Sequence, residues 1–131
     1  MNYIPTIESY FRDIEKGITA NFVEKYYAPD ATQTEQPNLL TPHGTVYKVA
    51  DIKKGTLTGG KGILSSQRID ISKIYQSGHT VIAEALWIGT LALPIGQIPI
   101  GGQMKAHITR IFEFENGKIV RQRNYDCFEP F

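Results

Sequence analysis

MKAHITRIFEFENGKIVRQRNYDCFEPF, the stretch from Met104 to Phe131, decides the fold. Its two alternating halves flank Asn116-Gly117, and both of these residues tolerate the positive φ that a tight hairpin turn needs. We therefore predict two antiparallel strands joined at this turn. Because side chains alternate along a strand, the second strand has two polar faces. One face carries Gln122, Asn124 and Asp126, and the other carries Arg121, Arg123 and Tyr125. Such a polar strand indicates either a solvated face or a polar pocket.

The front of the chain has the periodicity of helices. Apolar residues recur at three- and four-residue spacing in the first helix, which begins near Pro5: Ile7, Tyr10, Phe11 and Ile14. A second short helix over residues 22–27 ends at 28–30, since the residue before proline avoids helical geometry. Short strands are expected over residues 32–36 and 45–49. Asp51 is expected to cap a third helix, which the glycine-rich run 55–62 weakens. The glycines of that run lack phosphate-loop spacing, which argues against a phosphate site.

The remaining pattern is stranded. Residues 68–75 and 80–91 alternate around a turn at Ser77-Gly78, and residues 93–102 form a long connection that is a candidate lid. Helices followed by an antiparallel meander predict an α+β fold, in which N-terminal helices pack on the concave face of a curved, cone-shaped antiparallel sheet. With 131 residues, we expect a single domain over residues 1–131.

Composition excludes several classes of protein. The chain is 41% hydrophobic and 21% charged, with a net charge of +1, so it lacks the basic surface that nucleic acid or an anionic membrane requires. We expect neither as a partner. A single cysteine, Cys127, cannot form an internal disulfide, which suits the reducing cytosol. We see no signal peptide and expect a cytoplasmic protein.

Several segments resemble the nuclear transport factor 2-like superfamily, and within it the SnoaL-like group. They are Tyr26-Tyr27-Ala28-Pro29-Asp30-Ala31, Glu35-Gln36-Pro37-Asn38, Pro42-His43-Gly44, Trp87-Ile88-Gly89-Thr90, residues 112–119, and Arg123-Asn124-Tyr125. The resemblance spans nearly the whole chain. It implies a conical pocket between the sheet and the helices, and a homodimer through the outer face of the sheet. The fold hosts enzymes, binding proteins and transport factors alike.

The resemblance also implies where catalytic groups would lie. The polyketide cyclases and limonene epoxide hydrolases of the family keep an aspartate on the last strand just before a tyrosine, and here that position is Asn124. An amide cannot transfer a proton as a carboxylate does. The Arg and Asp that the epoxide hydrolases carry on the long strand are replaced by Glu84 and Leu86. Neither activity therefore carries over intact.

If the orientation of the family holds, alternation assigns the pocket face of each strand. We predict a catalytic set of Asp126, Glu84, Asn124 and Arg110. We predict a substrate-binding set of Gln33, Glu35, Gln122, Tyr26, Phe22, Leu86, Ile108 and Phe112. A largely apolar pocket with a few convergent polar groups is typical of a small-molecule site.

Each polar residue has an alternative reading. Asp126 is the best acid–base candidate, against a surface or salt-bridged carboxylate. Glu84 and Arg110 lie within apolar strands, where burial of an isolated charge is costly. One alternative is that the two pair across the sheet as a structural ion pair. The others are that Glu84 is reactive or that it is exposed to solvent. Glu35 is a catalytic carboxylate or a solvated strand edge. His107 is assigned to the outer face, and Cys127 to a buried apolar position rather than a nucleophile.

Two functions fit these residues. One is a lyase or isomerase that moves a proton next to a carbonyl without a cofactor, using Asp126 or Glu84 as base and Asn124, Gln122 or Arg110 at the oxyanion. The other is a non-catalytic protein that binds a small apolar organic ligand, which Asn124 favours. No cluster at metal-ligand spacing occurs in the sequence, so we expect no metal.

Overall fold

The structure is a computed structural model that describes residues 1–52 and 62–131. The helices in these residues are α1 (Ile4–Lys16), α2 (Ala20–Tyr26) and α3 (Val49–Ile52). The strands are β1 (Tyr27–Glu35), β2 (Thr45–Lys48), β3 (Leu64–Ser77), β4 (Thr80–Leu91), β5 (Gln103–Glu115) and β6 (Lys118–Phe128). The helices therefore come first and the long strands last, as the sequence predicts.

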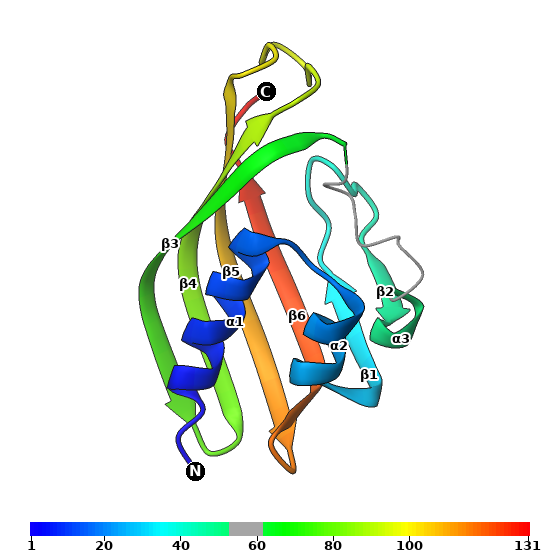
Figure 1. Cartoon of the computed structure of the whole chain (residues 1–131), viewed down its shortest axis with the longest axis vertical. Helices are drawn as coiled ribbons and strands as arrows, with labels where there is room; N and C mark the ends of the chain where they lie inside the picture. The colour runs from blue at the N-terminus through cyan, green and yellow to red at the C-terminus, as the bar shows by residue number, and fades with distance from the viewer. Residues whose placement is uncertain (53–61) are drawn as a thin grey trace.

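The six strands form one curved sheet in the order β2-β1-β6-β5-β4-β3 (Figure 1). Strands β3 to β6 are an antiparallel meander, but β1 runs parallel to β6, so the sheet is mostly rather than wholly antiparallel. The register shifts between Ile71 and Lys73 in β3 and between Glu113 and Phe114 in β5. Such irregularities increase local twist and help the sheet to curve.

The predicted hairpin joins β5 to β6. Asn116 has φ 51° and Gly117 has φ 79°, so both central residues adopt the positive φ of a two-residue turn. This turn fixes which residues of β5 and β6 face each other. Arg110 pairs with Asn124 and Ile108 pairs with Asp126, which places all four on the same face of the hairpin.

Helices α1 and α2 cover the concave face of the sheet (Figure 1). The apolar stripe predicted for α1, namely Ile7, Tyr10, Phe11 and Ile14, is buried. It packs into a cluster with inward residues of the strands that include Val81, Ala83 and Phe112. The hydroxyl of Thr19 accepts from the backbone N–H of Phe22 at 3.2 Å and begins α2. The helices and the concave face thus enclose the space in which the site lies.

Several element boundaries differ from expectation. Strand β3 spans Leu64–Ser77 and is longer than the predicted 68–75, and helix α2 ends at Tyr26. Strand β1 begins at Tyr27, five residues before the predicted start, because its parallel pairing with β6 extends back to Tyr27 and Ile119. Helix α3 begins at Val49, so Asp51 lies within its first turn instead of capping it. The expected weakening of this helix by the glycine run concerns residues 53–61, which lie outside the described residues. Among the helices described, none is long and apolar enough to cross a membrane.

Candidate functional site

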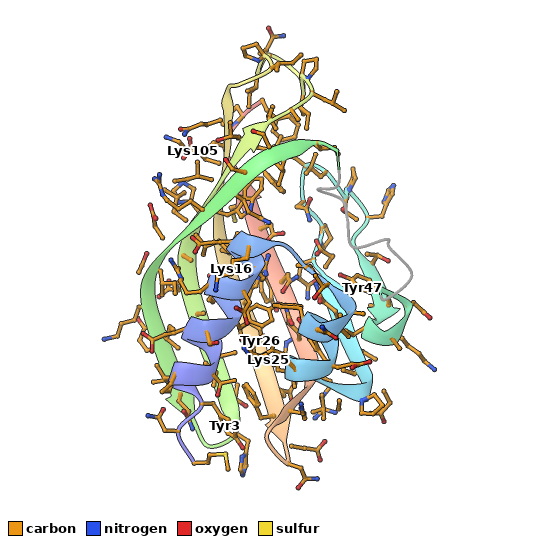
Figure 2. The ribbon with its side chains drawn as sticks, viewed as in Figure 1. Tyr3, Lys16, Lys25, Tyr26, Tyr47 and Lys105 are labelled. Carbon is orange, nitrogen blue, oxygen red and sulfur yellow. The ribbon has the colours of Figure 1, made fainter. Side chains whose placement is uncertain are left out.

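A cavity of about 1140 Å³ lies between the concave face of the sheet and the helices. Its apolar wall includes Ile14, Phe22, Trp87, Ile108 and Phe128. Figure 2 labels Lys16 at the end of α1 and Tyr47 on β2, which line the cavity from two sides. This volume suits a small organic molecule.

Three side chains form a polar row across the cavity floor: Glu35 on β1, Asn124 on β6 and Arg110 on β5. Glu35 is the register partner of Asn124, and Asn124 is the partner of Arg110. Because partners in a sheet share a face, the three side chains point into the same space. The amide of Asn124 donates to Glu35 Oε1 at 3.3 Å. The structure brings together Arg110 and Asn124 of the predicted catalytic set, and Glu35, predicted as a substrate-binding residue, joins them directly.

Further polar groups lie on both sides of the polar row. Gln33 is 8% exposed and pairs in register with Tyr47 on one side and with Gln122 on the other. Gln33 and Gln122 each lie two residues before the member of the polar row on their own strand. Asp126 lies two residues after Asn124 on β6, opposite Ile108. Gln33, Tyr47 and Asp126 all line the cavity. One end of the cavity therefore holds two carboxylates, a guanidinium, two amides and a phenol.

The charged groups of this polar end do not pair directly. In the described part of the chain, no carboxylate oxygen lies within 4.0 Å of the Arg110 guanidinium nitrogens. Nε of Arg110 and Oδ1 of Asp126 are both buried without a hydrogen-bond partner. The Arg110 guanidinium lies 6.0 Å from the ring centroid of Phe11, which gives it a weak cation–π contact. Buried polar groups are nearly always satisfied, so this end of the cavity has unused binding capacity.

The surroundings raise the pKa values of Glu35 and Tyr47. Burial raises the pKa of Glu35, and the nearby charge of Asp126 raises it further, while the Asn124 amide and Arg110 oppose the rise. Burial also raises the pKa of Tyr47, with Glu35 the next largest cause. A carboxyl group whose pKa moves up toward neutrality is better suited to accept and return a proton.

Gln122 is placed differently from the prediction. It is 1% exposed and lies behind the cavity wall, where its Oε1 accepts from the Tyr27 hydroxyl at 2.5 Å. Its Nε2 donates to Asn124 Oδ1 at 2.8 Å. Gln122 therefore contacts the polar row from behind and is not part of the cavity lining.

The prediction for Glu84 is wrong. Its pairing with Thr109 places it on the convex face, opposite to Asp126, where it is exposed. There it lies beside Lys73 and accepts a hydrogen bond from Tyr75, so it does not pair with Arg110. Leu86 shares the phase of Glu84 and also faces outward. The inward phase of β4 includes instead Val81, Ala83, Ala85 and Trp87.

Two aromatic predictions are also wrong in position. Tyr26 is buried, but its hydroxyl donates to Asp13 Oδ2 at 2.6 Å and contacts Ser9, so it points between the helices and away from the cavity. Phe112 is fully buried in the core and does not line the cavity. Phe22, Ile108 and Gln33 do line it, as predicted.

On the convex face, His107 lies outward as expected, and its Nε2 is 2.9 Å from Glu129 Oε2. Cys127 is the register partner of His107 and is exposed, not buried, because it shares this outward phase. Within the described residues, no group of three or more His, Cys, Asp or Glu side chains is arranged to hold a metal ion.

The sequence analysis did not select several lining residues. Trp87 faces the cavity, and its Nε1 donates to Gln67 Oε1 at 2.9 Å. Tyr47 lies on a four-residue edge strand whose pattern carries no information on which face is inward. The apolar phase shared by Ala83, Ala85 and Trp87 is visible in the sequence and gives the correct orientation of β4.

The connection over residues 93–102 is ordered by its own hydrogen bonds. Ile95 and Ile98 exchange backbone hydrogen bonds, and Gly101 N donates to Leu91 O at 2.8 Å. Ile95 lines the cavity, and Phe131 lies against Gly96. The connection is thus positioned at the cavity, and its function as a lid stays a prediction.

Comparison with solved structures supports the fold. Two putative polyketide cyclases have similar structures. IdmH from Streptomyces antibioticus has 18% identity and a TM-score of 0.77, and the match covers 96% of this chain and 92% of IdmH. A protein from Acidithiobacillus ferrooxidans has 23% identity and a TM-score of 0.68, and the match covers 92% of this chain and 84% of that protein. A protein of ketosteroid isomerase-like fold from Catenulispora acidiphila, in complex with trimethylamine, has 17% identity, a TM-score of 0.66 and coverage of 92% and 85%.

No curated protein matches this chain. At these identities the solved structures establish the fold and not an activity. The sequence itself matches the SnoaL-like domain over residues 7–122, which is most of its length. That match agrees with the helices, the curved sheet and the cavity described above, and the chain therefore belongs to the SnoaL-like family.

Proposed function

We propose that the cavity binds a small apolar carbonyl compound and that the chain moves a proton at the carbon next to the carbonyl, as a lyase or isomerase that needs no cofactor. The observation that supports this proposal is the polar end of the cavity. There Glu35, Asp126 and Arg110 surround one space without pairing within 4.0 Å of one another in the described residues.

The chemistry follows from these groups. A carboxylate takes the proton from the carbon, the C–H bond breaks, and its electron pair moves to the carbonyl oxygen to give an enolate. The guanidinium of Arg110, which stays protonated, stabilises that oxygen. The carboxylic acid then returns the proton to carbon at a second position. The apolar wall excludes water and holds the rest of the molecule.

The predicted catalytic set is revised accordingly. Asp126, Asn124 and Arg110 stay in the proposal, Glu84 leaves it, and Glu35 enters it as the second carboxylate. Gln33, Phe22 and Ile108 stay as ligand-binding residues, because they line the same cavity. Tyr26, Leu86, Phe112 and Gln122 leave that set.

The alternative is a cavity that binds a small molecule without catalysis. The observation that favours it is Asn124, an amide at the position where the cyclases of the family carry their aspartate. One relative of similar fold holds trimethylamine, which is consistent with a binding role for a cavity of this kind.

Trp87 provides a test, because it is the only tryptophan of the chain and lines the cavity. We expect 1-indanone, an apolar aromatic ketone, to change the fluorescence of Trp87. In D₂O we expect the protein to accelerate exchange of the protons next to its carbonyl, followed by NMR. Binding without accelerated exchange would favour the alternative function. If the fluorescence of Trp87 changes neither with this ketone nor with apolar aromatic compounds that lack the carbonyl, both functions are contradicted.

We also propose that two copies of the chain associate through the convex face of the sheet. The support is a group of exposed apolar and aromatic side chains on that face, next to its charged residues. Tyr75 is 48% exposed and Tyr125 is 39% exposed, and both lie on the convex side with Leu86. A sheet with apolar residues on both faces gains stability by covering both.

A further inference from the structure

A chain of buried hydrogen bonds ends on Glu35. The hydroxyls of Tyr10 and Tyr27 are 2.8 Å apart, and Tyr27 donates to Gln122 Oε1. Gln122 Nε2 donates to Asn124 Oδ1 at 2.8 Å, and Asn124 Nδ2 donates to Glu35 Oε1 at 3.3 Å. The chain therefore runs from α1 across β1 and β6 and returns to the last residue of β1.

The direction of this chain is set by the ionised carboxylate of Glu35, because it can only accept hydrogen bonds. The nitrogen of Asn124 therefore faces Glu35, and the oxygen of Asn124 accepts from Gln122 Nε2. The oxygen of Gln122 then accepts from the Tyr27 hydroxyl. Gln122 and Asn124 are each 1% exposed, so reversing the Asn124 amide would place its oxygen against the carboxylate at a buried position. The ionised form of Glu35 is thus held by the Asn124 donor.

The identity of residue 124 now has a physical explanation. An aspartate there would accept from Gln122 with one oxygen and place its other oxygen against Glu35 Oε1. Two carboxylates at hydrogen-bond distance cannot both stay ionised. Asparagine at 124 and a carboxylate at 35 are therefore complementary, and the carboxylate lies one strand away from the position used by the related cyclases.

We propose that Glu35 is the proton acceptor of this cavity and that Asn124, Gln122 and Tyr27 are positioning residues that hold its carboxylate. This inference rests on the proposed proton-transfer function. Glu35 takes the proton from the carbon next to the carbonyl, the electron pair of the C–H bond moves to oxygen, and Arg110 faces that oxygen. The protonated Glu35 then returns the proton to carbon, which restores the carboxylate.

The groups that act on Glu35 come from four strands. They are Tyr47 on β2, Arg110 on β5, Asn124 and Asp126 on β6, and Gln33 on β1 itself. Tyr10 on α1 and Asp51 on α3 line the same cavity. Burial is the largest influence and raises the pKa of Glu35, and Asp126 acts in the same direction. The hydrogen bond from Asn124 acts in the opposite direction. Loss of this donor should therefore raise the pKa of Glu35.

The first test compares Glu35→Gln with Asp126→Asn, using exchange of the 1-indanone protons in D₂O. We expect Glu35→Gln to lower the accelerated exchange about 10²- to 10⁴-fold, the usual contribution of a general base. We expect Asp126→Asn to lower the exchange by a smaller factor than Glu35→Gln, because Asp126 acts on Glu35 through its charge. The matched control is Glu84→Gln, the same change on the convex face, which should leave exchange unchanged. Exchange that survives Glu35→Gln but not Asp126→Asn would overturn the assignment.

The second test does not depend on activity. NMR titration of the Glu35 side-chain carboxyl should give a midpoint above the ordinary range, and both Asn124→Leu and Asn124→Asp should move it further up. The aspartate variant covers the case in which the leucine variant fails to fold. An unchanged midpoint in a folded variant would refute the positioning role. The titrations can give the expected midpoints while the wild-type protein does not accelerate exchange. In that case the proposed function is wrong, and so is the role of Glu35 as proton acceptor. The hydrogen-bonded chain that positions Glu35 would still be supported.

Discussion

The two faces of the β5–β6 hairpin carry the same kinds of charged residue in opposite arrangements. On the convex face, Glu113 accepts from Arg121 at 3.1 Å and from Arg123 at 2.5 Å. On the concave face, Arg110 has no carboxylate oxygen within 4.0 Å among the described residues, although Asp126 and Glu35 lie nearby. The same two strands therefore pair their charges where water is present and separate them where it is largely excluded.

This difference is the reverse of what stability alone favours. Ion pairs at the surface contribute little, and charges inside a protein are tolerated only when they are well paired. The charges on the concave face are inadequately paired, so burying them lowers the free energy of unfolding and no ion pair compensates for this loss. Groups of this kind are typical of functional sites, where stability is given up for binding or chemistry.

The largest expected effect separates the two arginines. Arg110→Met removes the cation that faces the carbonyl oxygen, and we expect it to lower the exchange of the 1-indanone protons about 10²- to 10³-fold, as for other oxyanion donors. Arg123→Met is the matched change on the convex face and should leave exchange unchanged. NMR in D₂O measures both. Equal effects of the two substitutions would remove the functional distinction between the faces.

A smaller effect is expected on the association of two chains, which would cover the convex face. We expect light scattering at micromolar concentration to give a dimer, because the apolar residues of this face need to be covered. Leu86→Lys places a charge in that contact and should weaken association by about 2 kcal/mol or more, as for a central interface residue. The control is Glu84→Gln, which adds no charge. A wild-type protein that is monomeric under these conditions would contradict the proposed dimer.

The smallest effect is on the free energy of unfolding. Replacing a glutamate by glutamine should change it in opposite directions on the two faces. Burial raises the pKa of Glu35, so its ionised form costs stability at neutral pH, and this cost disappears below the ordinary value of 4.5. Glu35→Gln should therefore stabilise the fold by about 0.5–2 kcal/mol at pH 7 and bring no gain at low pH. Denaturant unfolding at the two pH values measures the difference.

Glu113 should behave in the opposite way. Hydrogen bonds from Arg121 and Arg123 lower its pKa, so its stabilising contribution is present above the ordinary value of 4.5 and is lost as the pH falls through the lowered pKa. Glu113→Gln should cost about 0.2–1 kcal/mol at pH 7 and less in acid. If both glutamines shift stability in the same direction, the contrast between the faces has no energetic basis.

Local signals in the sequence predicted most of the fold. Asn116-Gly117 fixed the hairpin, and alternation along β6 placed Asn124 and Asp126 on the face opposite to Tyr125. The parallel pairing of β1 with β6 was not predicted, because it joins residues far apart in the chain and no local pattern specifies such a partner. The early start of β1 at Tyr27 was missed for the same reason.

The site was predicted only in part. Arg110 was placed on the correct face because its phase follows from the hairpin, whereas Glu84 was given the wrong phase on the evidence of family resemblance. Its neighbours Ala83 and Ala85 are both apolar and inward, and simple alternation would have placed Glu84 outside. The direction of the hydrogen bonds at Asn124 depends on atoms of three separate elements, α1, β1 and β6, and no sequence pattern contains that information.

The parallel pairing of β1 with β6 has a consequence for how the chain folds. Glu35 and Asn124 touch although 89 positions separate them in the chain. The meander from β3 to β6 joins strands that follow one another, whereas docking of β1 must close a much larger loop, which is entropically costly and slow. A folding intermediate with only the meander in place would hold Arg110 and Asp126 but not Glu35. The polar row of Glu35, Asn124 and Arg110 thus exists only once the sheet is complete.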